Sequence, residues 1–86
     1  MRVCHLCGAT QLIERHHVFG GARRKTSEAN GFVVDLCHYC HNEPPNGAHH
    51  NRAVATMLKR EAQTQYELTH TRAQWMALIG RNYRED

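Results

Sequence analysis

Two cysteine pairs with the same spacing constrain this chain more than any other feature. Cys4 and Cys7 form the first Cys-x-x-Cys pair, and Cys37 and Cys40 form the second. Four thiolates in two such pairs can complete a tetrahedral zinc site without another ligand. At 86 residues, a hydrophobic core alone gives a domain little stability. We therefore predict a structural Zn²⁺ on the four cysteines, with disulfides as the alternative.

The hydropathy of the sequence predicts the cellular compartment of the protein. The sequence has no apolar segment of the roughly 18–20 residues that a membrane-spanning helix needs. Its N-terminus also lacks the apolar segment of a secretory signal. We therefore expect a cytoplasmic protein with no membrane partner, in a reducing compartment where paired cysteines bind metal.

Strand-forming sequence lies on both sides of a glycine-containing loop. Residues 10–16 are predicted to form a strand that ends at a histidine doublet. Residues 32–37 are β-branched and apolar, and they predict a second strand. Between them, Ser27 is expected to cap a single helical turn. This order predicts a β-hairpin with a long connection.

A helical period replaces the strand pattern after Asn51. The first predicted helix is expected to bury one face, made of Val54, Met57, Leu58, Ala62, Gln65 and Tyr66. A second helix is predicted to begin at Thr71, because Thr71 and Gln74 have the spacing of a capping box. Gly80 is expected to end it. Its predicted buried stripe is Trp75, Met76, Leu78 and Ile79.

These elements predict a small zinc-stapled α+β domain that covers residues 1–86. Residues 1–50 would contain the cysteine pairs and the hairpin, and residues 51–80 would form the two helices. Residues 81–86 are expected to be a polar tail.

Histidine is unusually frequent, with eight in the chain. His16 and His17 are adjacent, and His41 directly follows the last cysteine. Successive side chains on a strand point to opposite faces, so His16 and His17 are expected to contact different groups. One can bind a cation while the other acts on a water beside it. Metal-dependent hydrolysis of a phosphodiester requires this division of roles.

The order Cys-x-x-Cys, His-His, Leu-Cys-x-x-Cys-His resembles the HNH endonucleases, and in particular small members encoded by phages and prophages. The resemblance implies a ββα-metal fold, here with an additional C-terminal helix. It also implies that the protein hydrolyses DNA with one divalent cation. Residues 13–18 match the first family motif, which implies His17 as general base and His16 as metal ligand. Residues 36–41 match the closing motif, which implies His41 as a second ligand. The implied active-site cation is Mg²⁺, Mn²⁺, Ni²⁺ or Zn²⁺.

Two positions depart from the family pattern. The family's middle asparagine usually lies five residues before the third cysteine, where this chain has Phe32. Asn30 is the nearest candidate for its bracing role. Toxin-type members take a further ligand four residues after the closing histidine, where this chain has Pro45. His49 or His50 is expected to replace it, and we favour His49 because it comes first after the turn.

Basic residues are concentrated near the N-terminus, although the net charge is only +3. A basic cluster beside histidines suits a polyanion, and a solvated surface is the alternative. The predicted nucleic-acid contacts are Arg15, Arg23, Arg24 and Lys25. Phosphate contacts do not read bases, so we expect DNA binding with little sequence preference. A homodimer or a phage-protein partner is left open, and a phage-encoded chain would act in the host cytoplasm.

Two other functions are compatible with the same residues. A non-catalytic zinc-stapled module would bind nucleic acid through the basic loop without cleaving it. A structural or interaction domain would dock a partner through the last helix, near Trp75 and Tyr83.

Overall fold

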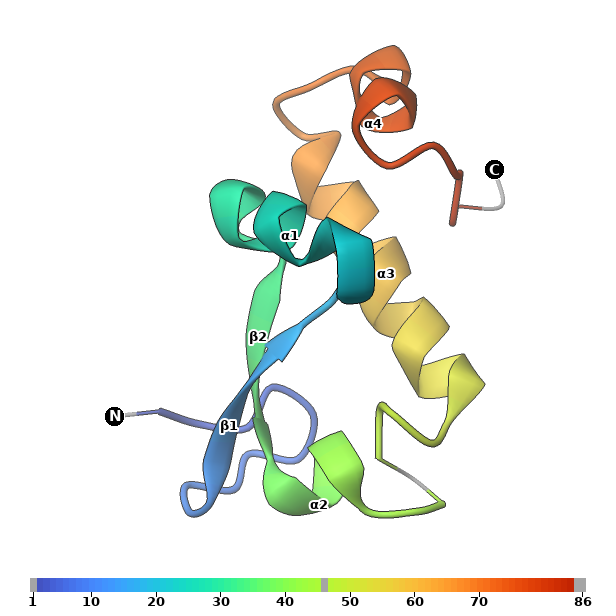
Figure 1. Cartoon of the computed structure of the whole chain (residues 1–86). Coiled ribbons are helices and arrows are strands. Elements are labelled where there is room, and N and C mark those ends of the chain that lie inside the picture. Colours follow the sequence, from blue (N-terminus) through green and yellow to red (C-terminus); the bar gives the residue numbers. More distant parts are fainter. Residues whose placement is uncertain (1, 46, 85–86) are drawn as a thin grey trace.

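A two-stranded antiparallel hairpin organises the first half of the chain (Figure 1). In the computed structural model, which describes residues 2–45 and 47–84, β1 spans Ile13–His17 and β2 spans Val33–Cys37. The register pairs His17 with Val33 at one end and Ile13 with Cys37 at the other. The hairpin thus joins the second cysteine pair to the histidine doublet. The predicted α+β architecture with a hairpin is confirmed. The first strand begins at Ile13, three residues later than predicted.

The connection between the strands differs from its prediction. It contains a 3₁₀ turn, Gly21–Arg23, and the helix α1, Arg24–Asn30, which ends at Gly31 with a left-handed φ of 74°. Ser27 was expected to cap this helix, but it lies inside α1 and is fully buried. Its hydroxyl donates to the carbonyl of Phe19 and accepts from the amide of Phe19. The serine therefore ties α1 to the segment that directly follows β1.

A short helix and a tight turn follow β2. The helix α2, His38–Asn42, begins directly after the strand and had not been predicted as a separate element. In the turn, a Cβ atom on Gly47 would lie 2.7 Å from the amide nitrogen of Glu43. Glycine is therefore required where the chain passes so close to itself. Asn46, part of the predicted Pro-Pro-Asn-Gly turn, lies outside the described residues.

Two more helices complete the fold. The helix α3 spans Arg52–Tyr66, and the side chain of Asn51 caps it by accepting from the amide of Val54. The helix α4 spans Arg72–Leu78 and begins at the capping box predicted for Thr71 and Gln74. No helix in the described ranges has the length and apolar character needed to cross a membrane.

Aromatic residues form the centre of the core. Phe32 packs edge-on against Trp75 with ring centroids 5.5 Å apart, and Phe19 contacts both rings. The other buried apolar residues are Cys4, Val18, Leu36, Cys37, Ala48, Leu58 and Ile79. Trp75 is completely buried, so it is a core residue and cannot serve as the docking residue considered above.

The predicted helix faces are correct at their centres and wrong at their edges. Met57 and Met76 were expected to be buried, but 39% and 38% of their surfaces are exposed. Gln65 is also exposed, whereas Gln63 is completely buried. An apolar period cannot predict a buried glutamine, because its burial depends on polar partners elsewhere in the chain.

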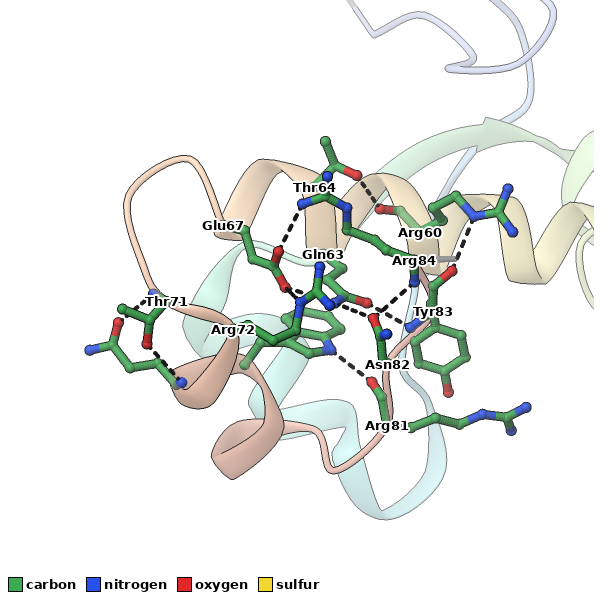
Figure 2. A network of polar contacts seen from close by, with 12 residues as sticks. Arg60, Gln63, Thr64, Glu67, Thr71, Arg72, Arg81, Asn82, Tyr83 and Arg84 are labelled. Carbon is green, nitrogen blue, oxygen red and sulfur yellow. Dashed lines mark hydrogen bonds and ion pairs between the residues drawn. The ribbon is translucent and has the colours of Figure 1, made fainter. Parts of the chain in front are cut away.

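Those partners belong to the C-terminal segment (Figure 2). The side-chain carbonyl of Gln63 accepts from the amide of Tyr83 at 2.7 Å, and its NH₂ group donates to Asn82 at 2.8 Å. The indole N–H of Trp75 donates to the carbonyl of Arg81 at 2.7 Å. Residues 81–84 are therefore attached to α3 and α4, and the rest of the predicted polar tail, residues 85–86, lies outside the described residues.

Glu67 gives this network a pH dependence. Its carboxylate accepts from Arg72 at 2.7 Å, from Gln63 at 2.7 Å and from Arg84 at 2.8 Å, and its side chain is 9% exposed. The hydrogen bond from Arg72, followed by that from Gln63, lowers the pKa of Glu67 to about 2. Because the ionised form is favoured in the folded state, this contribution to stability is complete above the ordinary pKa of 4.5. It is lost as the pH falls towards 2.

We expect Glu67→Gln to lower the melting temperature at pH 7, because the variant removes the charged acceptor of two arginines. The difference from wild type should narrow between pH 4.5 and pH 2, where the wild-type carboxylate becomes protonated. Thermal melts followed by circular dichroism at several pH values measure this. Glu61→Gln is the control, because Glu61 is an exposed residue of α3, the helix that ends just before Glu67, and its pair with His5 should contribute little. A destabilisation that stays constant across this pH range would contradict the assignment.

Candidate metal centre

The four cysteines form one cluster. Their sulfur atoms all lie within 4.8 Å of one another, and the Sγ atoms of Cys7 and Cys37 are 3.6 Å apart. Zinc–sulfur bonds of about 2.3 Å place tetrahedral ligands about 3.8 Å apart. All four cysteines are free thiols, so the disulfide alternative is not adopted. The cluster can therefore hold a structural metal such as zinc, as the spacing predicted.

Backbone contacts bring the two cysteine pairs together. The amide of Cys4 donates to the carbonyl of Ala9, which closes the first loop on itself. The amide of His5 then donates to the carbonyl of Asp35, which fixes that loop against the edge of β2. A metal at the cluster would thus connect the N-terminus to the hairpin and to α2.

The thiols also favour a cation electrostatically. Burial opposes ionisation of Cys4, but nearby backbone amides, first that of Cys37, outweigh it and lower the pKa of Cys4 to about 6. Burial chiefly raises the pKa of Cys40. Thiols packed this closely cannot all ionise unless a positive charge lies between them.

Three histidines form a second cluster. One ring nitrogen from each of His16, His41 and His49 lies within 4.8 Å of the others. The Nε2 atoms of His41 and His49 are 2.9 Å apart, which is close to the spacing of two adjacent ligands on one cation with metal–nitrogen distances of about 2.0–2.1 Å. These are the three residues predicted as the active-site ligands. His50, the alternative to His49, is exposed and lies outside the cluster.

Each histidine reaches the cluster from a different element. His16 projects from β1 and His41 from α2. His49 comes from the turn before α3, where its amide donates to the carbonyl of His41 at 3.1 Å. The neighbouring amide of Ala48 donates to the carbonyl of Cys40 at 2.7 Å. The turn is therefore attached to α2 where α2 carries Cys40 of one cluster and His41 of the other.

The state of His16 fits a metal ligand. Only 6% of its surface is exposed, and its Nδ1 atom is buried without a hydrogen-bond partner in the described parts of the chain. Burial chiefly lowers the pKa of His16 to about 4, with further lowering by His41 and His49. The imidazole is therefore neutral at pH 7, as coordination requires. A bound ion is one of the groups that can satisfy a buried polar atom of this kind.

Glu14 orients the ring of His41. Its carboxylate accepts from Nδ1 of His41 at 2.8 Å, so the opposite nitrogen of that ring faces His49. The same carboxylate contacts Nδ1 of His38 at 2.9 Å and accepts from the side-chain NH₂ group of Asn42 at 2.9 Å. Hydrogen bonds from His38 and then His41 lower the pKa of Glu14, which keeps it ionised. A carboxylate behind a ligating histidine fixes the tautomer and raises the basicity of that ligand.

We expect Glu14→Gln to weaken metal binding at the histidine cluster by about 10–100-fold, the usual effect of losing such a partner. Titration with Co²⁺ or Ni²⁺ followed by absorbance measures the affinity. Glu43→Gln is the matched control, because Glu43 contacts His38 but no member of the cluster. Equal affinities of the Glu14→Gln variant and wild type would show that Glu14 does not support the ligand.

His17 faces a different set of groups from His16. Its Nε2 atom lies 2.7 Å from the carboxylate of Glu28 in α1, and its side chain is 12% exposed. Glu28 also accepts two hydrogen bonds from Arg15, at 3.2 and 2.8 Å. Hydrogen bonds from Arg15 and then His17 lower the pKa of Glu28. Because an ionised carboxylate can only accept, Nε2 carries the proton and Nδ1 is the basic nitrogen of a neutral His17.

The remaining predicted site residues either contact other groups of the protein or are exposed. The side chain of Asn30 donates to the carbonyl of Thr26 within α1. From the same helix, the side chain of Ser27 contacts Phe19 in the segment after β1. Arg15 is engaged by Glu28, and the guanidinium of Arg23 donates to the carbonyl of Leu78. Arg24 and Lys25 are exposed and have no ion-pair partner among the residues described.

Comparisons with protein-family models, curated proteins and solved structures found no match to this chain. The chemistry of the site therefore rests on its own residues. Two carboxylates that bind predicted site histidines had been missed from the sequence, Glu14 and Glu28. The first had a signal, because Glu14 and His16 are two residues apart on a strand and so share a face. The second had none, because its contact depends on where α1 packs.

Proposed function

We propose that this protein is a metal-dependent endonuclease of the HNH type that hydrolyses phosphodiester bonds of DNA. The main support is the juxtaposition of two adjacent histidines with separate environments. His16 joins a cluster of three possible metal ligands, whereas His17 is held by a carboxylate outside that cluster. This is the division between cation binding and proton transfer that phosphodiester hydrolysis needs.

His17 would act as the general base. Its Nε2–H donates to Glu28, which orients the ring and stabilises the positive charge that the ring acquires with a second proton. Its Nδ1 would take the proton from the attacking water. The pairing resembles other base–carboxylate arrangements, in which the carboxylate positions the imidazole and does not itself accept the proton.

The three-histidine cluster would hold one divalent cation. His16, His41 and His49 leave coordination positions for water and for a phosphate oxygen, because catalytic sites keep part of the coordination sphere open. A cation there would stabilise charge on the phosphate and on the leaving oxygen. The hairpin and α2 would thus form a ββα-metal arrangement, with the cysteine-bound zinc as its structural staple.

DNA would be held mainly through its phosphates. Arg24 and Lys25 are exposed on α1, the helix that also carries Glu28. Phosphate contacts give affinity that falls with salt and carries little sequence information. We therefore propose that the domain alone cleaves with little sequence preference.

The decisive experiment measures metal content and DNA cleavage on the same samples. We expect the wild type to retain one zinc on the cysteines, to bind a second cation more weakly, and to nick supercoiled plasmid only when that second site is filled. His16→Ala should keep the zinc and lose both the second cation and the nicking. His70→Ala is the control, because His70 stacks on Tyr66 and lies outside the cluster. DNA binding without any nicking, under all metals tested, would instead support a non-catalytic zinc module.

A further inference from the structure

Lys59 is a cation held against two aromatic rings. It projects from α3 and is half-buried, with its Nζ atom 5.8 Å from the ring centre of Phe19 and 5.6 Å from that of Tyr83. Ammonium groups are attracted to the faces of such rings. No carboxylate pairs with Lys59 among residues 2–45 and 47–84. Its charge is therefore available to an anion from outside the protein.

Lys59 lies against the segment that directly follows β1, the strand that carries His16. Phe19, one of the rings that contacts Lys59, follows His17 by two residues along the chain. A lysine on α3 is thus brought close to the end of the strand that contributes His16 to the histidine cluster.

The C-terminal segment fixes the second ring (Figure 2). The amide of Tyr83 donates to Gln63 at 2.7 Å, and its carbonyl accepts from Arg60 at 3.1 Å. With its backbone held on both sides, the tyrosine places its ring 5.9 Å from that of Phe19. The close view shows the ring of Tyr83 projecting away from the polar network that holds its backbone. The C-terminal segment therefore holds in place a ring whose centre lies 5.6 Å from the Nζ atom of Lys59.

We propose that Lys59 binds a phosphate of the nucleic acid next to the phosphate at the histidine cluster, and that Tyr83 is its positioning residue. This inference rests on the proposed function for the class of ligand, a polyanionic phosphodiester, but not on cleavage. A purely structural lysine would pack on the rings equally well. Only a phosphate contact makes its charge matter for binding and for the salt dependence of binding.

The test is DNA binding by the zinc-loaded protein without a second metal. Fluorescence anisotropy with a labelled duplex oligonucleotide, at several salt concentrations, gives the affinity and its salt slope. Lys59→Met keeps most of the apolar stem and removes the charge. We expect it to weaken binding by roughly five- to tenfold and to reduce the salt slope by about 1. Lys59→Arg should restore both values.

Two further variants separate charge from packing. Tyr83→Phe keeps the ring and should bind like wild type, whereas Tyr83→Ala should lose part of the affinity. Arg81→Gln is the matched control, because Arg81 lies 5.2 Å from the same ring and its loss also removes one positive charge. We expect this variant to have a smaller effect than Lys59→Met. Melting temperatures of all variants identify losses that come from unfolding.

Wild-type affinity and salt slope in Lys59→Met would overturn the proposal, as would equal losses in Lys59→Met and Arg81→Gln. Should Lys59→Met fail to fold, Lys59→Gln replaces it with the same criteria. Failure of the proposed nuclease activity has a different signature. In that case the wild type would not nick plasmid with added metal, yet its DNA binding would still depend on Lys59.

Discussion

Replacing His17 by alanine is expected to give a folded, metal-binding protein that cleaves DNA about 10²–10⁴-fold more slowly, the usual contribution of a general base. The reason is the separation of roles at the histidine doublet. His17 contacts Glu28 and is not a member of the three-histidine cluster, so its loss should leave both metal sites intact. The rate of plasmid nicking under saturating metal measures the effect.

Two companion measurements make the result specific. Metal content and circular dichroism should match wild type, which excludes unfolding as the cause. His70→Ala provides a histidine loss outside the site and should cleave normally. If the His17→Ala variant cleaves at the wild-type rate, another group must activate the water and the proposed mechanism is wrong.

Replacing Cys37 by serine is expected to unfold the domain. Cys37 ends β2, is buried, and lies 3.6 Å from Cys7 within the sulfur cluster. Zinc binding by such cysteine sets supplies roughly 10–16 kcal/mol in small zinc domains. That is as large as the whole free energy of unfolding of a typical native domain, roughly 5–15 kcal/mol. Loss of one thiolate should therefore remove both the zinc and the cooperative melting transition.

Far-UV circular dichroism and zinc per chain test this second prediction. His16→Ala is the comparison, because it removes a member of the histidine cluster and should keep one zinc and a normal fold. A Cys37→Ser variant that loses its zinc but melts like wild type would show that the cysteine cluster does not stabilise the fold.

Local patterns carried most of the correct expectations. Two Cys-x-x-Cys pairs were sufficient to predict the sulfur cluster, because such spacing fits one tetrahedral ion. The capping box at Thr71 and Gln74 was read directly, because it depends on residues three apart. The three histidines of the cluster were also those predicted from the sequence as active-site ligands. Their role in binding a cation stays a prediction.

Long-range contacts explain what the sequence did not reveal. Glu28 reaches His17 only because α1 returns over the hairpin, and Ser27 is buried for the same reason. Gln63 appears polar in sequence, yet it is buried because the C-terminal segment supplies partners for its amide. A residue at the end of the chain cannot be assigned to such a network by periodicity.

The central claim is that the three-histidine cluster holds the cation that makes cleavage possible. The most direct measurement is plasmid nicking as a function of metal equivalents added to protein freed of metal and then reconstituted with zinc. We predict no cleavage with one equivalent, which the cysteines retain, and cleavage that rises in proportion to occupancy of the second site. Full cleavage with one equivalent, or none when the second site is saturated, would contradict the claim.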